Sequence, residues 1–147
     1  MTKTKTSPNQ IALYTPYAAF TVALLSMAGS LYFSEVKDFL PCLLCWYQRI
    51  CMYPLVAILA IGILRKDTRV YQYVLPLVVV GLGIALYHVG LYYNIFPESD
   101  QTCRAGVSCT TKYVEYLGFV TIPLLSATAF AVIGGCMLAL RKHGTRS

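Results

Sequence analysis

The sequence predicts an all-α membrane protein, a single bundle of four transmembrane helices formed by residues 1–147. Composition is the first reason: 57% of the residues are apolar and only 12% are charged, with a mean hydropathy of +0.60. A soluble domain of this size carries about twice that share of charge. Length is the second reason, because a helix needs about 20 residues to cross the hydrocarbon core. Four apolar runs reach that length, at residues 11–33, 43–64, 70–96 and 116–140.

The first run, residues 11–33, is free of charge over 23 residues. Lys3 and Lys5 precede it, as basic residues precede the apolar segment of a signal peptide. That segment is normally about 7–15 residues long, and the run here is longer and lacks a strong cleavage motif. We therefore expect it to remain as the first transmembrane helix.

The other three apolar runs are almost as free of charged residues. Arg49 is the single charge in residues 43–64. His88 is the only basic side chain in residues 70–96, and residues 116–140 carry no charge. Each of the four runs contains a proline, which membrane helices tolerate where neighbouring groups satisfy the freed carbonyl. We expect each run to form one transmembrane helix.

Basic residues concentrate on one side of the predicted bundle. Eight of them lie there: Lys3, Lys5, Arg65, Lys66, Arg69, Arg141, Lys142 and Arg146. The opposite side, formed by residues 34–42 and 97–115, holds three: Lys37, Arg104 and Lys112. Because cytoplasmic loops are enriched in Lys and Arg, we expect both termini in the cytoplasm, in a multi-pass protein of the plasma or inner cell membrane. This topology accounts for the net charge of +6 without a nucleic-acid partner.

Four of the six cysteines form two close pairs on the outer side of this topology. Cys42 and Cys45 form a CxxC motif, typical of redox and metal sites, at the outer end of the second run. Cys103 and Cys109 lie in the long outer connection. Disulfides persist on that side of a membrane. The two pairs together therefore indicate thiol chemistry at the outer membrane edge.

The spacing around the first pair predicts its local geometry. Pro41 suits the first turn of a helix, where its missing N–H costs nothing. From that start, Cys42, Cys45 and Arg49 project within about 60° of one another. The helix dipole and the cation both favour a thiolate. Desolvation by the membrane opposes them, so the sequence leaves the direction of the net pKa shift open.

Arg49 and His88 are predicted to lie at a similar depth near the outer face. Arg49 is about 10 Å below Cys42, and His88 is about 12 Å below Phe96, at 1.5 Å per residue. An arginine within a membrane span costs roughly 2.5–3.5 kcal/mol, which favours a functional reason for it. Two polar groups beside a CxxC motif suit an apolar two-electron acceptor with carbonyl oxygens, and a lipid-soluble quinone has that chemistry.

Simpler interpretations of both residues stay open. Arg49 can extend its charged end to the outer surface while its stem lies along apolar atoms. His88 can be a hydrogen-bonded core histidine. It shares a helix stripe with Gly81, Ala85 and Tyr92, a face of small residues of the kind that packs against another helix.

A longer motif carries a family resemblance. Residues 41–49, Pro-Cys-Leu-Leu-Cys-Trp-Tyr-Gln-Arg, resemble the signature of the disulfide bond formation protein B family (DsbB), most closely its short BdbC-type branch. Residues 85–88, Ala-Leu-Tyr-His, also resemble the family's third helix. The likeness covers nearly the whole chain: four spans, a CxxC motif opening the second, and a cysteine pair in the loop before the fourth.

This resemblance implies a quinone-dependent thiol-disulfide oxidoreductase, a protein dithiol:quinone enzyme. Its partner would be an extracytoplasmic thioredoxin-like thiol oxidase of the DsbA/BdbD type, which it re-oxidises. Its cofactor would be quinone from the membrane pool, either menaquinone or ubiquinone, with the short branch favouring menaquinone. We expect no resident metal ion.

The resemblance also implies residue roles. Electrons pass from the Cys103/Cys109 pair to the Cys42/Cys45 pair and then to quinone. In the family pattern Cys103 forms the mixed disulfide with the partner, and Cys109 passes electrons to Cys42.

Cys45, as a thiolate, lies against the quinone. The family arginine at Arg49 supports the bound quinone, and the histidine at His88 is a weaker candidate contact.

Two features depart from the better-known proteobacterial pattern. Only residues 104–108 separate the second pair of cysteines, where that branch has a much longer segment. The short loop leaves open whether Cys103 or Cys109 takes the mixed disulfide. Gln48 precedes the arginine, where that branch often has glutamate.

Three other classes stay as alternatives. The vitamin K epoxide reductase family combines four helices, quinone and two cysteine pairs, but in the reverse order along the chain. A metal-handling protein would use the two pairs as ligands, and a structural protein would use them as stabilising disulfides. Free thiols after denaturation discriminate: two for the oxidase, from Cys51 and Cys136 within the spans, and six for a stripped metal site.

Overall fold

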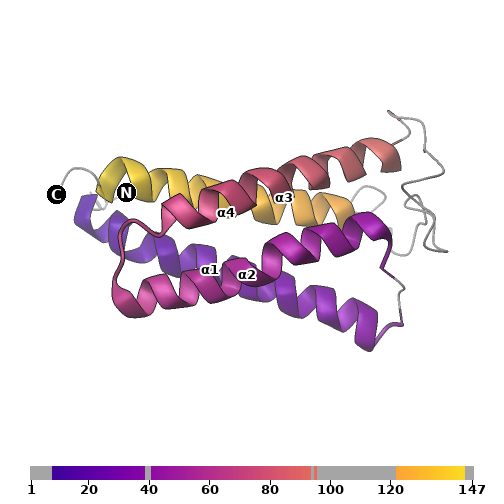
Figure 1. Cartoon of the computed structure of the whole chain (residues 1–147), viewed down its shortest axis with the longest axis horizontal. Coiled ribbons are helices and arrows are strands. Elements are labelled where there is room, and N and C mark those ends of the chain that lie inside the picture. The colour runs from indigo at the N-terminus through magenta and orange to yellow at the C-terminus, as the bar shows by residue number, and fades with distance from the viewer. Residues whose placement is uncertain (1–7, 39–40, 94, 96–121, 145–147) are drawn as a thin grey trace, which may run out of the picture.

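The computed structural model describes residues 8–38, 41–93, 95 and 122–144, with side chains described from Tyr14 to Lys142 within those ranges. The residues so described form four helices, which run lengthwise in an elongated bundle (Figure 1): α1 (Pro8–Glu35), α2 (Leu43–Arg65), α3 (Tyr71–Tyr92) and α4 (Ile122–Gly144). The described residues form no β-strand. The predicted all-α class is confirmed.

Each helix contains a segment long and apolar enough to cross a membrane: Tyr14–Glu35, Leu43–Arg65, Tyr71–Tyr92 and Ile122–Lys142. Helices suit such segments because lipid offers no partner for backbone N–H and C=O groups, so every bond must be made within the segment. Large apolar side chains such as Leu25, Val79 and Leu138 are exposed on the outside of the bundle. That surface suits contact with lipid rather than water.

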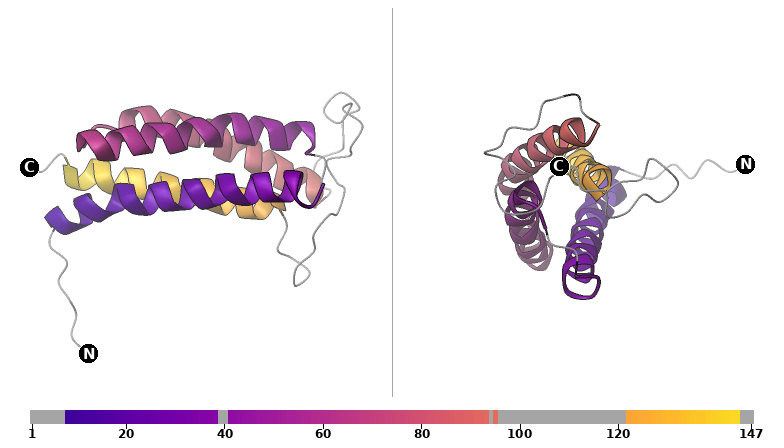
Figure 2. Two further views of the ribbon diagram at one scale, coloured as in Figure 1. Left: turned by 90° about the horizontal axis from the view of Figure 1, so that it is seen from below. Right: turned by 90° about the vertical axis from the view of Figure 1, so that its right-hand side faces the viewer.

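The helices form a ring in which α2 and α4 each contact both α1 and α3, as the end-on view of Figure 2 shows. Apolar side chains from all four helices are fully buried in its core, including Ala23, Leu55, Val74, Phe130 and Met137. The start of α1, the end of α4 and the α2–α3 connection lie at one end of the bundle (Figure 1). The start of α2 and the end of α3 lie together at the other end, so the CxxC motif and His88 share that end.

Gly81 of α3 packs directly against the Phe130 side chain of α4. A Cβ atom placed on it would lie 2.4 Å from Cε1 of Phe130, far inside van der Waals contact. Gly81, Ala85 and His88 are all buried. The small-residue stripe predicted for this helix therefore does pack against a neighbouring helix, and it holds His88 inside the bundle.

The described helix ends differ from the predicted spans in the third helix. α3 ends at Tyr92, with Tyr93 as its C-cap, although the apolar run continues to residue 96. The N–H of Ile95 bonds back to the carbonyl of Gly90 at 2.8 Å, which turns the chain out of the helix. Apolar composition identifies membrane contact, but it does not identify the residue at which a helix stops. The predicted start of the fourth span, residues 116–121, lies outside the described residues.

Candidate functional site

Cys42 and Cys45 begin α2. Cys42 is the N-cap residue with an extended backbone, φ −68° and ψ 169°, and its carbonyl accepts the first helical hydrogen bond from the Trp46 N–H at 3.1 Å. The two Sγ atoms are 3.0 Å apart, and both residues are thiols in this structure. A disulfide bond is about 2.05 Å long, so a small side-chain rotation joins the two sulfurs.

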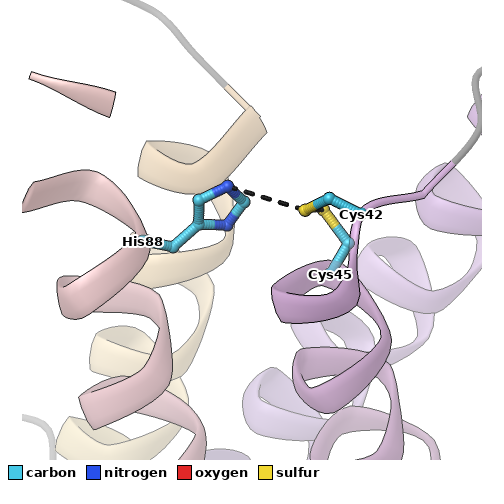
Figure 3. A group of neighbouring side chains, drawn as sticks. All are labelled: Cys42, Cys45 and His88. Atoms are coloured by element: carbon cyan, nitrogen blue, oxygen red, sulfur yellow. Dashed lines mark hydrogen bonds between the residues drawn. The ribbon is translucent and has the colours of Figure 1, made fainter. Parts of the chain in front are cut away.

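His88 reaches this pair from α3. Its Nε2 atom lies 3.8 Å from the Cys42 Sγ, and Figure 3 shows the ring directed at the two sulfurs across the gap between the helices. Cys42 is 6% exposed and His88 is 3% exposed, while Cys45 is only partly buried. The ligand atoms of these three residues all lie within 4.8 Å of one another. The Cys42 sulfur is therefore enclosed beside His88, and the Cys45 sulfur is more open.

Gln48 completes the group, and reasoning from the sequence did not identify it as a site residue. Its side-chain Nε2 lies 3.2 Å from Nδ1 of His88, and its side chain is buried. An amide N–H that donates to Nδ1 puts the proton of a neutral imidazole on Nε2, which faces Cys42. One feature of the sequence could have identified Gln48: its primary amide lies within an apolar helix, three residues after Cys45. Such a group needs a buried partner.

The surroundings of Cys42 favour its thiolate. The hydrogen bond with the Cys45 thiol lowers the pKa of Cys42 to about 4; burial opposes this effect, and the hydrogen bond and electrostatic attraction of His88 support it. Cys42 precedes the span Leu43–Arg65, so it stands at the edge of the membrane segment. The sequence left open the direction of the net pKa shift of Cys42, and the structure shows that the pKa is lowered. The thiolate is the nucleophilic form of cysteine.

Arg49 lies on another side of α2, where its hydrogen-bond partner is Ser30 of α1. Its Nε donates to the Ser30 hydroxyl at 2.8 Å, and its Nη2 donates to the Ser30 carbonyl at 2.9 Å. Its guanidinium carbon is 5.6 Å from the ring centre of Trp46. Consecutive helical residues project about 100° apart, so Gln48 faces α3 while Arg49 faces α1.

Arg49 also has donor capacity to spare. Within the described part of the chain, its Nη1 group has no hydrogen-bond partner. This donor belongs to a partly buried side chain one turn below Cys45, the more open of the two sulfurs. A carbonyl oxygen suits such a donor, so the residues present fit a quinone better than they fit an apolar lipid chain.

The remaining cysteines divide into two groups. Cys51 is buried in the main core and Cys136 packs against it, as expected for small apolar side chains. Cys103 and Cys109, predicted as the partner-facing pair, lie outside the described residues.

Comparison with known proteins identifies the family of the chain. The family model described as "Disulfide bond formation protein DsbB" matches residues 14–140. Disulfide bond formation protein C of Bacillus subtilis is 49% identical over 118 residues, which is 80% of this chain and 85% of the relative. Probable disulfide formation protein C of Halalkalibacterium halodurans is 45% identical over 125 residues, 85% of this chain and 91% of the relative.

A third relative, probable disulfide formation protein C 1 of Bacillus cereus, is 42% identical over 135 residues, covering 91% of this chain and 94% of its own length. No solved structure matches the chain. The family match includes the CxxC motif at the start of α2, His88 on α3 and all four membrane-length helices. The chain therefore belongs to the DsbB family, the membrane oxidoreductases of disulfide bond formation.

Proposed function

We propose that this protein re-oxidises an extracytoplasmic thioredoxin-like thiol oxidase and passes the electrons to membrane quinone. The observation that carries the proposal is the CxxC pair at one end of the bundle, with one sulfur enclosed beside His88 and the other more open. DsbB-family membership supports it, because the family generally uses quinone. The names of the similar bacterial proteins, disulfide formation protein C, agree with a thiol oxidase pathway.

The thiol steps are exchanges in which one S–S bond breaks as another forms. A thiolate of the reduced partner attacks the Cys103–Cys109 disulfide, and the partner's second thiolate then attacks the mixed disulfide and leaves oxidised. The reduced loop pair attacks the Cys42–Cys45 disulfide in the same way, which leaves Cys42 and Cys45 as thiols. Each exchange conserves two electrons, so the net change is one oxidised partner and one reduced CxxC pair.

Quinone, when bound, supplies the two-electron oxidation that regenerates the Cys42–Cys45 disulfide. Arg49 would hold a quinone oxygen through the Nη1 donor, since its Nε and Nη2 are already fixed on Ser30. Positive charge held there stabilises negative charge that develops on that oxygen. Cys45 lies one turn above Arg49 and is the more open sulfur, which supports it as the quinone-facing thiol.

His88 belongs to the enclosed side of the pair. Gln48 orients its ring, and the Nε2–H group of the neutral ring can donate a hydrogen bond to the Cys42 thiolate. The contact with Cys42 supports a role in stabilising this thiolate more than a first contact with quinone. We therefore rank Arg49 above His88 as the quinone-binding residue.

Both termini are proposed to be cytoplasmic. Arg65, Lys66 and Arg69 lie in or beside the α2–α3 connection, at the same end of the bundle as Arg141 and Lys142 of α4 (Figure 1). A single cysteine introduced at Lys66 should resist a membrane-impermeant thiol reagent in intact cells, whereas one introduced at Lys37 should react. The reverse pattern would place the redox site on the cytoplasmic side.

The reaction with quinone can be tested apart from the partner. In a Cys103→Ser/Cys109→Ser variant, reduced and purified in detergent, added quinone should remove two titratable thiols per protein and form the Cys42–Cys45 disulfide. The same treatment of a variant that also carries Cys45→Ser should remove none. Retention of all thiols in the first variant, with any quinone, would contradict the proposed electron path.

A further inference from the structure

We propose that the reduced CxxC pair and His88 form a binding site for a thiophilic divalent cation of the Zn²⁺ type. Its ligands would be Sγ of Cys42, Sγ of Cys45 and Nε2 of His88. We further propose that the bound ion holds the protein in its reduced form. The observation is the convergence of three ligand atoms from two helices within 4.8 Å, at an end of the bundle that faces the membrane edge.

The distances are close to those of a tetrahedral site. Zn–S bonds of about 2.3 Å and Zn–N bonds of about 2.0–2.1 Å place two sulfurs about 3.8 Å apart and a sulfur and nitrogen about 3.6 Å apart. The distance from the Cys42 Sγ to the His88 Nε2 is 3.8 Å. The two sulfurs, at 3.0 Å, must separate by somewhat less than 1 Å, which a rotation of the partly buried Cys45 side chain provides.

Gln48 supplies the support that a metal-bound histidine needs. A histidine that binds a metal through one ring nitrogen almost always donates its other N–H to a hydrogen-bond acceptor. Gln48 lies 3.2 Å from Nδ1 of His88, and turning its amide over presents the carbonyl oxygen to an Nδ1 proton. One glutamine can therefore serve both forms of the ring, the metal-free and the metal-bound.

Burial and charge also fit a cation. Cys42 and His88 are more than nine-tenths buried, so they shield the ion from water. Cys45 is partly buried, so it leaves a path of entry and space for a fourth ligand. Both sulfurs bind as thiolates, so the ion displaces any thiol proton still present, and the two thiolates neutralise its charge.

Only the reduced pair can bind in this way, because the thiolate is the metal-binding form of cysteine. The cation and disulfide formation therefore compete for the same two sulfurs. The ion itself undergoes no redox change, so no oxidant or reductant is consumed on binding. The proposal that the bound ion blocks re-oxidation of the CxxC pair rests on the proposed redox function. The proposal that the reduced pair binds the ion does not.

The binding test uses the Cys103→Ser/Cys109→Ser variant in detergent, reduced and freed of reductant, with Cd²⁺ as a spectroscopic probe and Zn²⁺ in competition with a chromogenic chelator. We expect one ion per protein, with thiolate-to-Cd²⁺ charge-transfer absorption. Oxidising the same sample should abolish binding, and this comparison needs no further mutation. His88→Ala should weaken Zn²⁺ binding at least tenfold, while Cys51→Ser, a cysteine of the main core, should leave it unchanged.

Several outcomes would overturn the site: no saturable binding by the reduced protein, equal binding by the oxidised protein, or equal affinity in Cys45→Ser. The two proposals fail separately. If quinone oxidises the thiols but no ion binds, the cation site is wrong and the oxidase function stands. If one ion binds through these residues but no quinone oxidises the thiols, the site stands and the proposed function fails.

Discussion

Arg49 of α2 is anchored to Ser30 of α1 by two hydrogen bonds, one to the hydroxyl at 2.8 Å and one to the backbone carbonyl at 2.9 Å. These bonds hold a cation within the bundle, one helical turn below the more open sulfur of the CxxC pair. They use two of its three nitrogen groups and leave Nη1 without a partner among the described residues. The structure therefore presents Arg49 as a fixed donor rather than as a side chain extended to the membrane surface.

Replacing Arg49 should weaken quinone use more than it weakens the thiol steps. Arg49→Ala removes the charged donor, so we expect the apparent KM for quinone to rise by well over tenfold, with mixed-disulfide formation by the partner unchanged. Ser30→Ala removes one of the two anchors. A hydrogen bond to a charged group is worth about 1.5–3 kcal/mol net, and the carbonyl anchor remains, so the rise should reach about tenfold at most.

Ser26→Ala is the matched control for Ser30→Ala, because the Ser26 hydroxyl donates to the Val22 carbonyl of its own helix. The measurement is the apparent KM for quinone, obtained by titrating each of the three purified variants with quinone. An unchanged apparent quinone affinity in Arg49→Ala would contradict the quinone contact and leave Arg49 with a structural role, the link between α2 and α1.

Gly81 and Gly83, two residues apart on α3, should respond differently to alanine. A Cβ on Gly81 would lie 2.4 Å from the Phe130 ring, whereas a Cβ on Gly83 would have no atom within 4 Å. Overpacking of this kind typically costs about 1–3 kcal/mol, so Gly81→Ala should lower the thermal unfolding midpoint in detergent. Gly83→Ala should leave it equal or slightly higher. Equal destabilisation by both changes would contradict the packing of α3 on α4.

The resting protein should contain two disulfides. Counting free thiols after denaturation under non-reducing conditions should give two per chain, from Cys51 and Cys136, and none in a Cys51→Ser/Cys136→Ser variant. Both of these cysteines are in or beside the main core, so they should react only after the bundle unfolds. A count of six in protein purified without reductant would favour a metal-handling protein, in which none of the cysteines is oxidised.

Cys45→Ser should separate the two halves of the reaction. The proposed Cys103–Cys109 disulfide would not depend on Cys45, so the variant should still trap a thioredoxin-like partner whose resolving cysteine has been removed. The trapped complex is visible as a mixed disulfide on a non-reducing gel. The same trapping in Cys103→Ser and in Cys109→Ser would identify which loop sulfur the partner attacks. Failure of Cys45→Ser to trap any partner would mean that the two pairs do not act in sequence.

The sequence was sufficient for the number and type of the helices, because the bilayer sets the length of a span and excludes unsatisfied backbone. It was also sufficient for the closeness of Cys42 and Cys45, which follows from a helical spacing of three residues. The end of α3 at Tyr92 was not predictable from apolar composition, which continues to residue 96. The apolar composition is set by contact with lipid and does not determine the residue at which the helix ends.

The partners of the polar side chains could not be predicted from the sequence. Gln48 and His88 are 40 residues apart, and Ser30 and Arg49 are 19 residues apart. Each contact depends on how one helix is rotated against another, and the apolar pattern of a membrane helix carries little information on rotation, since most of its faces are apolar. Arg49 and His88 were predicted at a similar depth, but the helix that supplies the hydrogen-bond partner of each could not be predicted for this reason.

The most direct test of the proposed function is quinone reduction by the detergent-purified protein, supplied with a reduced thioredoxin-like dithiol as electron donor. We expect one quinone reduced for each dithiol oxidised, with menaquinone and ubiquinone compared in parallel. We also expect that turnover disappears in Cys45→Ser. Quinone reduction that persists in Cys45→Ser, or its absence in the unmodified protein with either quinone, would contradict the assignment of Cys42 and Cys45 as the quinone-linked redox pair.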